Sequence, residues 1–139
     1  MKYTTSIVWF KKDLRTFDHA PLYHAAQNGD VTCIYIYEDE LMKYPYSDRH
    51  FNFLQGSLIE LDWSLRKIGS HLQIFRGSAQ SVFSEILEHC NIEAVYSHHV
   101  TGDWKSFERE KKIATFCRVK GIHWNECEYN GVACGVKNR

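Results

Sequence analysis

The strongest constraint on the fold is the regular alternation of strand patterns and helix patterns along the 139 residues. Short β-branched or aromatic apolar runs predict strands, and apolar residues spaced three and four apart predict helices. Such alternation is typical of a parallel sheet that is covered by helices on both faces. Because crossover connections are right-handed, we expect a five-stranded parallel sheet in a doubly wound, Rossmann-like, three-layer α/β/α fold.

The positions of the expected elements follow from these patterns and from the turn residues between them. Strands are predicted at residues 5–10, 31–37, 72–75, 92–96 and 122–127. Helices are predicted at about 19–28, 49–67 and 105–120, and a further helix follows the turn at Gly77 and Ser78. Asp18 is the expected N-cap of the first helix, and Pro21 falls in its first turn, where its missing N–H does little harm.

Two of the helices carry apolar faces that we expect to be buried against the sheet. In the long helix this face consists of Leu54, Leu58, Leu61, Leu65 and Ile68. In the last helix it consists of Phe107, Ile113, Phe116 and Cys117.

Composition narrows the classes of protein that fit. Hydrophobic residues make up 44% of the chain, which is enough for one folded core. Lys+Arg and Asp+Glu both number 17, so the basic excess of a stand-alone nucleic-acid binder is missing. No apolar run approaches the ~18 residues of a membrane span, so we expect no membrane partner. The five cysteines lack zinc-ligand spacing. We interpret them as reduced thiols of a cytoplasmic protein that binds no metal.

Ligands of doubly wound sheets bind outside the carboxyl ends of the strands, near the point where the strand order reverses. This rule selects the loops at residues 10–17, 37–48 and 97–105. The first of them lacks the glycine motifs of a dinucleotide site or a P-loop. It offers instead Lys11, Lys12, Asp13 and Arg15, which either tie the turn to its neighbours by ion pairs or contact a polar ligand.

Aromatic residues lie close to the same edge. Trp9 and Tyr37 flank the expected crevice, where they would either fill the core or form the walls of a site for a flat conjugated ligand. No Ser-His-Asp or Cys-His arrangement can be argued from the order or spacing of residues, so no catalytic residue is assigned.

The run IVWFKKDLRTFDHAPLYHAA resembles the N-terminal motif of the DNA photolyase and cryptochrome family. That motif is a strand, an aromatic residue, two basic residues, Asp-Leu-Arg, and an aspartate before a helix. Here the matching residues are Phe10, Lys11, Lys12, Asp13, Leu14, Arg15 and Asp18. The segments VTCIYIYEDE, RHFNFLQGSLIELDWSLRKIGSHLQIFRG, FEREKKI and YNGVACGVKNR resemble later parts of the family pattern, so the resemblance covers essentially the whole chain.

Two departures from the family pattern bear on function. The basic pair is Lys-Lys where Arg-Arg is common, which keeps the charge but loses planar, bidentate pairing. The chain also stops where a linker would begin, because in this family a larger helical domain follows and holds FAD, the electron-transfer tryptophans and the DNA-binding face. We therefore expect an α/β domain at residues 1–128 and the start of a linker to an absent FAD-binding helical domain at 129–139.

The resemblance implies a parent protein that is either a photolyase, a lyase that repairs pyrimidine dimers by light-driven electron transfer, or a cryptochrome. This chain alone is expected to be non-catalytic and to house an antenna chromophore, which is a folate, a deazaflavin, FMN or a lumazine. Its expected partners are the helical domain and, through that domain, damaged DNA. Self-association of the isolated domain is expected if the docking face is left exposed. The antenna-site residues that the resemblance implies are Lys12, Asp13, Tyr35, Tyr37, Glu38, Arg49, Phe53 and Thr101.

An alternative function belongs to a different class. A free-standing α/β domain of this kind would serve as a nucleotide-binding sensor or adaptor, since a fold does not settle a function. The last stretch, residues 128–139, has no periodicity of its own and favours the first interpretation, because domain boundaries fall in such linkers.

Overall fold

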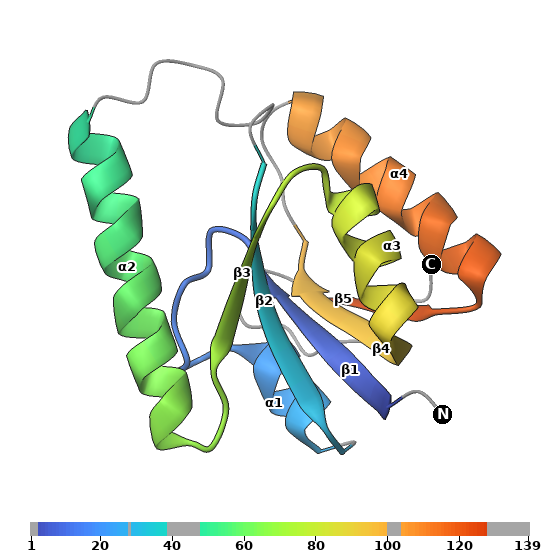
Figure 1. The fold of residues 1–139 in the computed structure, drawn as a ribbon, viewed down its shortest axis with the longest axis horizontal. Helices are drawn as coiled ribbons and strands as arrows, with labels where there is room; N and C mark the ends of the chain where they lie inside the picture. Colours follow the sequence, from blue (N-terminus) through green and yellow to red (C-terminus); the bar gives the residue numbers. More distant parts are fainter. Residues whose placement is uncertain (1–2, 28, 39–47, 100–103, 128–139) are drawn as a thin grey trace.

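The computed structural model describes residues 3–27, 29–38, 48–99 and 104–127, and no side chains at 48–51. Its centre is a sheet of five parallel strands in the order β3-β2-β1-β4-β5 (Figure 1). The strands are β1 (Tyr3–Phe10), β2 (Val31–Tyr37), β3 (Leu72–Arg76), β4 (Cys90–His98) and β5 (His123–Cys127). The predicted five-stranded, doubly wound parallel sheet is therefore confirmed. The order reverses between β1 and β4, which places the topological switch point there.

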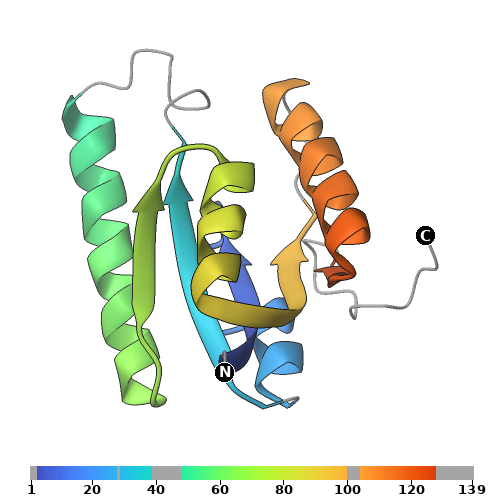
Figure 2. The ribbon, with the colours of Figure 1, turned by 45° about the vertical axis from the view of Figure 1, so that its right-hand side comes forward.

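Four helices cover the two faces of this sheet (Figures 1 and 2). They are α1 (Ala20–Ala26), α2 (Asp48–Lys67), α3 (Ala79–His89) and α4 (Trp104–Lys120). Residues of α1 and α2 pack with one set of buried sheet residues, and residues of α3 and α4 pack with the other. Strands β1, β2 and β4 therefore place side chains in both of two separate cores.

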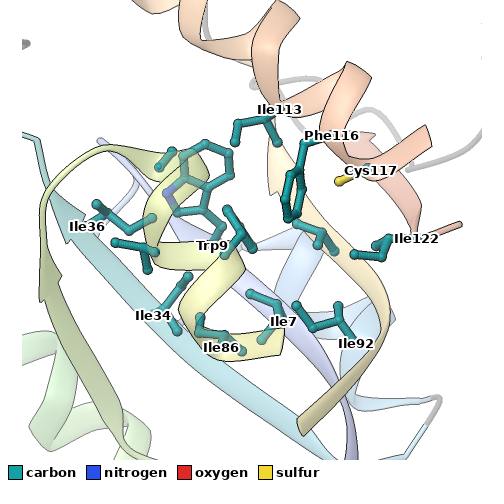
Figure 3. Close-up of a cluster of buried hydrophobic side chains, with 14 residues drawn as sticks. Ile7, Trp9, Ile34, Ile36, Ile86, Ile92, Ile113, Phe116, Cys117 and Ile122 are labelled. Atoms are coloured by element: carbon teal, nitrogen blue, oxygen red, sulfur yellow. The ribbon is translucent and has the colours of Figure 1, made fainter. Parts of the chain in front are cut away.

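Strand β1 supplies the centre of both cores because it is apolar on both faces. Val8 and Phe10 face α1 and α2, whereas Ile7 and Trp9 face α3 and α4. Trp9 lies edge-on to Phe83 of α3, with ring centroids 5.3 Å apart. Figure 3 shows this second core, with Trp9 among isoleucines from the strands and from both helices. Continuous apolar character is typical of strands that are buried on both faces.

The first helix begins differently from the prediction. Its N-cap is His19, whose side chain accepts the backbone N–H of Leu22. Asp18 has a positive φ of 49°, a left-handed conformation unlike the extended backbone of an N-cap. Aspartate adopts that conformation more readily than most residues. The assignment of the cap to Asp18 was therefore wrong by one residue, whereas Pro21 does lie in the first turn.

The predicted helix faces are confirmed in the middle of each helix but not at every end. Leu58, Leu61 and Leu65 of α2 are buried. Ile68 is 62% exposed because α2 ends at Lys67, which leaves Ile68 in the turn. In α4, Phe107 is half-exposed, whereas the other predicted core residues, Ile113, Phe116 and Cys117, are buried.

Two further expectations concern cysteines and membranes. Cys33, Cys90 and Cys117 are free thiols. Cys127 is disulfide-bonded, so the expectation of five reduced thiols is wrong for that residue.

None of the described helices combines the length and the apolar character that crossing a bilayer requires.

Candidate functional site

The candidate site is the edge of the sheet at which β1, β2 and β4 end. These strands are parallel neighbours, and Phe10 of β1 is in register with Tyr35 of β2. The chain segments that continue from both strands therefore leave the sheet at the same edge. The charged turn at residues 11–19 follows β1 there, beside the switch point between β1 and β4.

Asp13 is the centre of this turn and is 1% exposed. Its Oδ1 accepts the backbone N–H of Lys11 at 2.8 Å, which closes the turn on itself. Its Oδ2 accepts hydrogen bonds from His19 Nε2 at 2.5 Å and from His98 Nδ1 at 2.6 Å. The turn after β1 is thereby joined to the first helix and to the end of β4.

Burial alone would raise the pKa of Asp13. The hydrogen bonds from His19 and His98 outweigh it and hold the pKa of this carboxyl well below its ordinary value. Asp13 is therefore a carboxylate at neutral pH, and both of its oxygens accept hydrogen bonds from within the protein.

Asp13, His19 and His98 also have the residue types of a metal site, and their ligand atoms lie within 4.8 Å of one another. Two features favour a hydrogen-bonded cluster instead. First, ligands of a tetrahedral zinc ion with bonds of about 2.0–2.1 Å are about 3.3 Å apart, whereas the oxygen–nitrogen distances here are 2.5 and 2.6 Å. Second, His19 Nδ1 accepts the N–H of Leu22, so the ring proton lies on Nε2, the atom that faces Asp13.

A second cluster of charges lies on the other face of the same edge and contains two cations and two carboxylates. Lys11 Nζ lies 2.8 Å from Glu110 Oε1 and donates to the carbonyl of His98 at 3.0 Å. Arg109 Nε lies 3.2 Å from Glu110 Oε2, and Arg109 Nη1 is paired with Glu38 Oε1. The cluster thus connects the ends of β1, β2 and β4 to helix α4.

Trp9 forms the apolar floor beneath both cations. Lys11 Nζ lies 4.4 Å from the ring centroid and the guanidinium carbon of Arg109 lies 5.0 Å from it, both within cation–π range. Burial lowers the pKa of Lys11, and the facing Glu110 opposes that shift. Burial likewise raises the pKa of Glu38, against the opposing effect of Arg109. Each charge is thus held by a partner of opposite sign.

The residues that the family resemblance implied are distributed over both faces. Asp13 is buried in the turn, and Lys12 beside it is exposed. Tyr35 is buried and Tyr37 is half-buried, both on the α1 and α2 face. Glu38 points to the opposite face, where it pairs with Arg109. The structure therefore does not bring all of these residues into one site.

The remaining members of that set lie on α2 or outside the described residues. Phe53 is 77% exposed on α2. Arg49 belongs to α2, but its side chain is outside the described residues, as is all of Thr101. Trp9, an expected crevice wall, is buried in the core beneath Lys11 and Arg109.

Sequence reasoning missed the parts of the site that come from distant segments. His19 and His98 belong to no recognisable sequence motif, yet together they hold Asp13. Glu110 lies in the segment FEREKKI, and no local signal indicates that it pairs with Lys11, 99 residues earlier. For the two histidines, a polar side chain close to a predicted strand end was the available signal.

Comparisons with known proteins agree with the fold. Residues 6–133 match the family model described as DNA photolyase. The cryptochrome DASH of Synechocystis sp. is 33% identical over 115 residues, which are 76% of this chain and 23% of that protein. The chain therefore spans about a quarter of the length of the relatives it matches.

Solved structures of whole photolyases contain a similar unit. A bacterial class III photolyase from Agrobacterium tumefaciens superposes with a TM-score of 0.79 at 26% identity, covering 92% of this chain and 26% of that one. An archaeal photolyase from Sulfolobus tokodaii, described with two FAD molecules and the implication of a novel light-harvesting cofactor, superposes with a TM-score of 0.78. It is 33% identical, and the match covers 89% of this chain and 29% of that one.

Proposed function

Because the chain belongs to the DNA photolyase family, we propose that it is the N-terminal antenna domain of a photolyase or cryptochrome. In this role it holds a light-harvesting chromophore at the carboxyl edge of its sheet. The chromophore is a folate, a deazaflavin, FMN or a lumazine, and it passes excitation to a flavin held elsewhere. The Sulfolobus photolyase described with a light-harvesting cofactor supports this role.

The observation that carries the proposal is the set of hydrogen bonds that hold the turn after β1 in place. Asp13 is fixed by three hydrogen bonds from Lys11, His19 and His98. This leaves the neighbouring Lys12 exposed at the edge where Tyr37 also emerges, on the adjacent strand. An exposed cation and a half-buried aromatic residue at the same carboxyl edge of the sheet suit a flat ligand with polar substituents.

The activity of the parent protein extends the proposal beyond this chain. We propose that residues 1–128 form the antenna domain and that 129–139 lead toward a helical domain. That second domain would bind FAD and damaged DNA, and either repair pyrimidine dimers in light or signal in response to it. This chain spans 20–29% of the length of its matched relatives, and its proposed share of the activity is structural support and light capture.

Fluorescence titration of the purified chain tests the antenna assignment. FMN, a deazaflavin, a lumazine and a folate are each added to wild-type protein and to a Lys12→Ala, Tyr37→Leu double variant. We expect one of them to bind wild type with a Kd below about 100 μM and to bind the double variant at least tenfold more weakly. The matched control is Lys120→Ala, an exposed lysine at the end of α4.

Circular dichroism shows whether each variant retains the fold before its affinity is compared. The assignment is wrong if no chromophore binds the folded wild-type chain below about 100 μM. It is also wrong if the double variant binds as tightly as the control, because the ligand then lies elsewhere.

A further inference from the structure

A groove of about 640 Å³ lies between the N-terminal ends of α3 and α4, beside the end of β2. Gly77 to Gln80 form one wall, the first turns of α4 form the other, and Ala79 and Ile113 supply apolar surface. Its volume is in the range of about 300–1,000 Å³ that is usual for small-molecule sites. Of the antenna residues whose side chains the structure describes, Glu38 alone is among those that line this groove.

The wall from α4 is basic. Lys105, Glu108, Arg109 and Lys112 line the groove, and their spacing of three, four and seven places them on one helix face. Glu38 is paired with Arg109, and Glu108 Oε2 lies 3.7 Å from Lys111 Nζ. The acidic groups of the groove are thus neutralised.

Positive charge therefore remains in the groove. Within the residues that the structure describes, Lys105 and Lys112 form no ion pair. The opposite wall adds to this charge, because α3 begins at Ala79 with its N-terminus at the groove. The partial positive charge of a helix N-terminus reinforces a site that the lysines already make attractive to an anion.

An aromatic ring lies at the end of the groove where α4 begins. Trp104 lines the groove and is 69% exposed, although tryptophan is usually largely buried. Lys112 is eight residues further along the helix, which corresponds to a rise of about 12 Å. This separation is comparable with the extended length of a nucleoside diphosphate, from its base to its terminal phosphate.

We propose that this groove binds a nucleoside phosphate. The base stacks on Trp104, and the phosphates lie between Lys112 and the N-terminus of α3. Base–aromatic stacking contributes about 1–3 kcal/mol per base, and the lysines supply charge without base specificity. The proposal is independent of the antenna site, since a different set of side chains carries it.

Isothermal titration of the full chain with ADP, at low and high salt, tests the proposal. We expect ADP to bind with a Kd below about 1 mM and to bind more weakly as salt increases. Adenosine lacks the phosphates and inorganic phosphate lacks the ring, so each should bind at least tenfold more weakly than ADP. Equal affinity of ADP and either partial ligand would overturn the proposal, as would no binding of ADP below 1 mM.

Matched variants locate the site. Lys112→Gln and Trp104→Leu should each weaken ADP binding three- to tenfold, whereas Lys120→Gln on the same helix should leave it unchanged. If the first two variants, shown to be folded by circular dichroism, bind ADP as wild type does, the groove is not the site. Lys112→Gln should leave chromophore binding at Lys12 and Tyr37 unchanged, so the two proposals fail separately.

Discussion

His19 Nε2 lies 2.5 Å from Asp13 Oδ2, while His19 Nδ1 accepts the N–H of Leu22 in the first turn of helix α1. One imidazole ring therefore connects the buried carboxylate to the N-terminus of the helix. This double role requires a neutral ring with its proton on Nε2, because a proton on Nδ1 would face the N–H of Leu22. The turn after β1 and the start of α1 are thus stabilised together.

Asp13→Asn should destabilise the fold. The substitution removes the negative charge between His19 and His98 and replaces one acceptor oxygen with a donor. A hydrogen bond to a buried charged group contributes about 1.5–3 kcal/mol, and urea unfolding monitored by circular dichroism would measure the loss. Asp18→Asn is the matched control, because Asp18 is exposed and asparagine also adopts a positive φ. Equal losses in the two variants would contradict this role of Asp13.

The contribution of Asp13 should disappear in acid. Its pKa is lower in the folded chain than in the unfolded chain, so the stabilisation is complete above the unfolded value of about 3.9. It declines as pH falls below that value, by about 1.4 kcal/mol per pH unit. The difference in unfolding free energy between wild type and Asp13→Asn should therefore shrink by about 1 kcal/mol between pH 4 and pH 3. A difference that stays constant over that interval would mean that Asp13 does not titrate as inferred.

The buried pair Lys11–Glu110 should show strong energetic coupling. Glu110→Gln leaves the Lys11 ammonium buried with one partner fewer, and Lys11→Met leaves Glu110 with Arg109 alone. Each single variant should lose about 1–3 kcal/mol, and the double variant should lose less than the sum of the two. A double-mutant cycle in urea measures the coupling. The exposed i,i+3 pair Lys111–Glu108 is the control and should give less than about 1 kcal/mol.

Cys33 and Cys117 should be inert in the folded chain. Burial raises the pKa of both thiols to about 11, so the reactive thiolate is scarce at pH 8. Labelling with a thiol-reactive disulfide, located by mass spectrometry, should be at least a hundredfold slower at these sites in native protein than in urea. The same raised pKa predicts that stability declines above about pH 9, as the unfolded thiols ionise first. Rapid labelling of either thiol in the native chain would show that these residues are accessible.

The purified chain should neither retain FAD stoichiometrically nor repair pyrimidine dimers under blue light. The proposed FAD and DNA sites belong to a helical domain beyond these residues, and the chain spans about a quarter of its relatives. Absorption spectra of the purified protein and a dimer-repair assay test this expectation, with a complete photolyase as the positive control. Measurable light-dependent repair by the isolated chain would contradict the proposal that FAD binding and repair require the helical domain.

The sequence by itself determined the layers of this protein. Short apolar runs and period-3.6 patterns depend on neighbours within a few residues, so they predicted the five strands and most of the helix faces. The failures lie at element ends, such as Asp18 and Ile68, where geometry at a single residue decides the outcome. The carboxyl edge of the sheet followed from topology, which the alternation of elements had already restricted.

The identity of the charged partners was decided only by the tertiary structure. Asp13 meets His98 across 85 residues, Glu38 meets Arg109 across 71, and Lys11 meets Glu110 across 99. Such pairings depend on which strand ends and helix turns become neighbours, and on the low dielectric that makes each buried charge require a partner. No local pattern encodes either condition. The sequence therefore predicts where the charged turn lies, and the tertiary structure determines which residues pair with it.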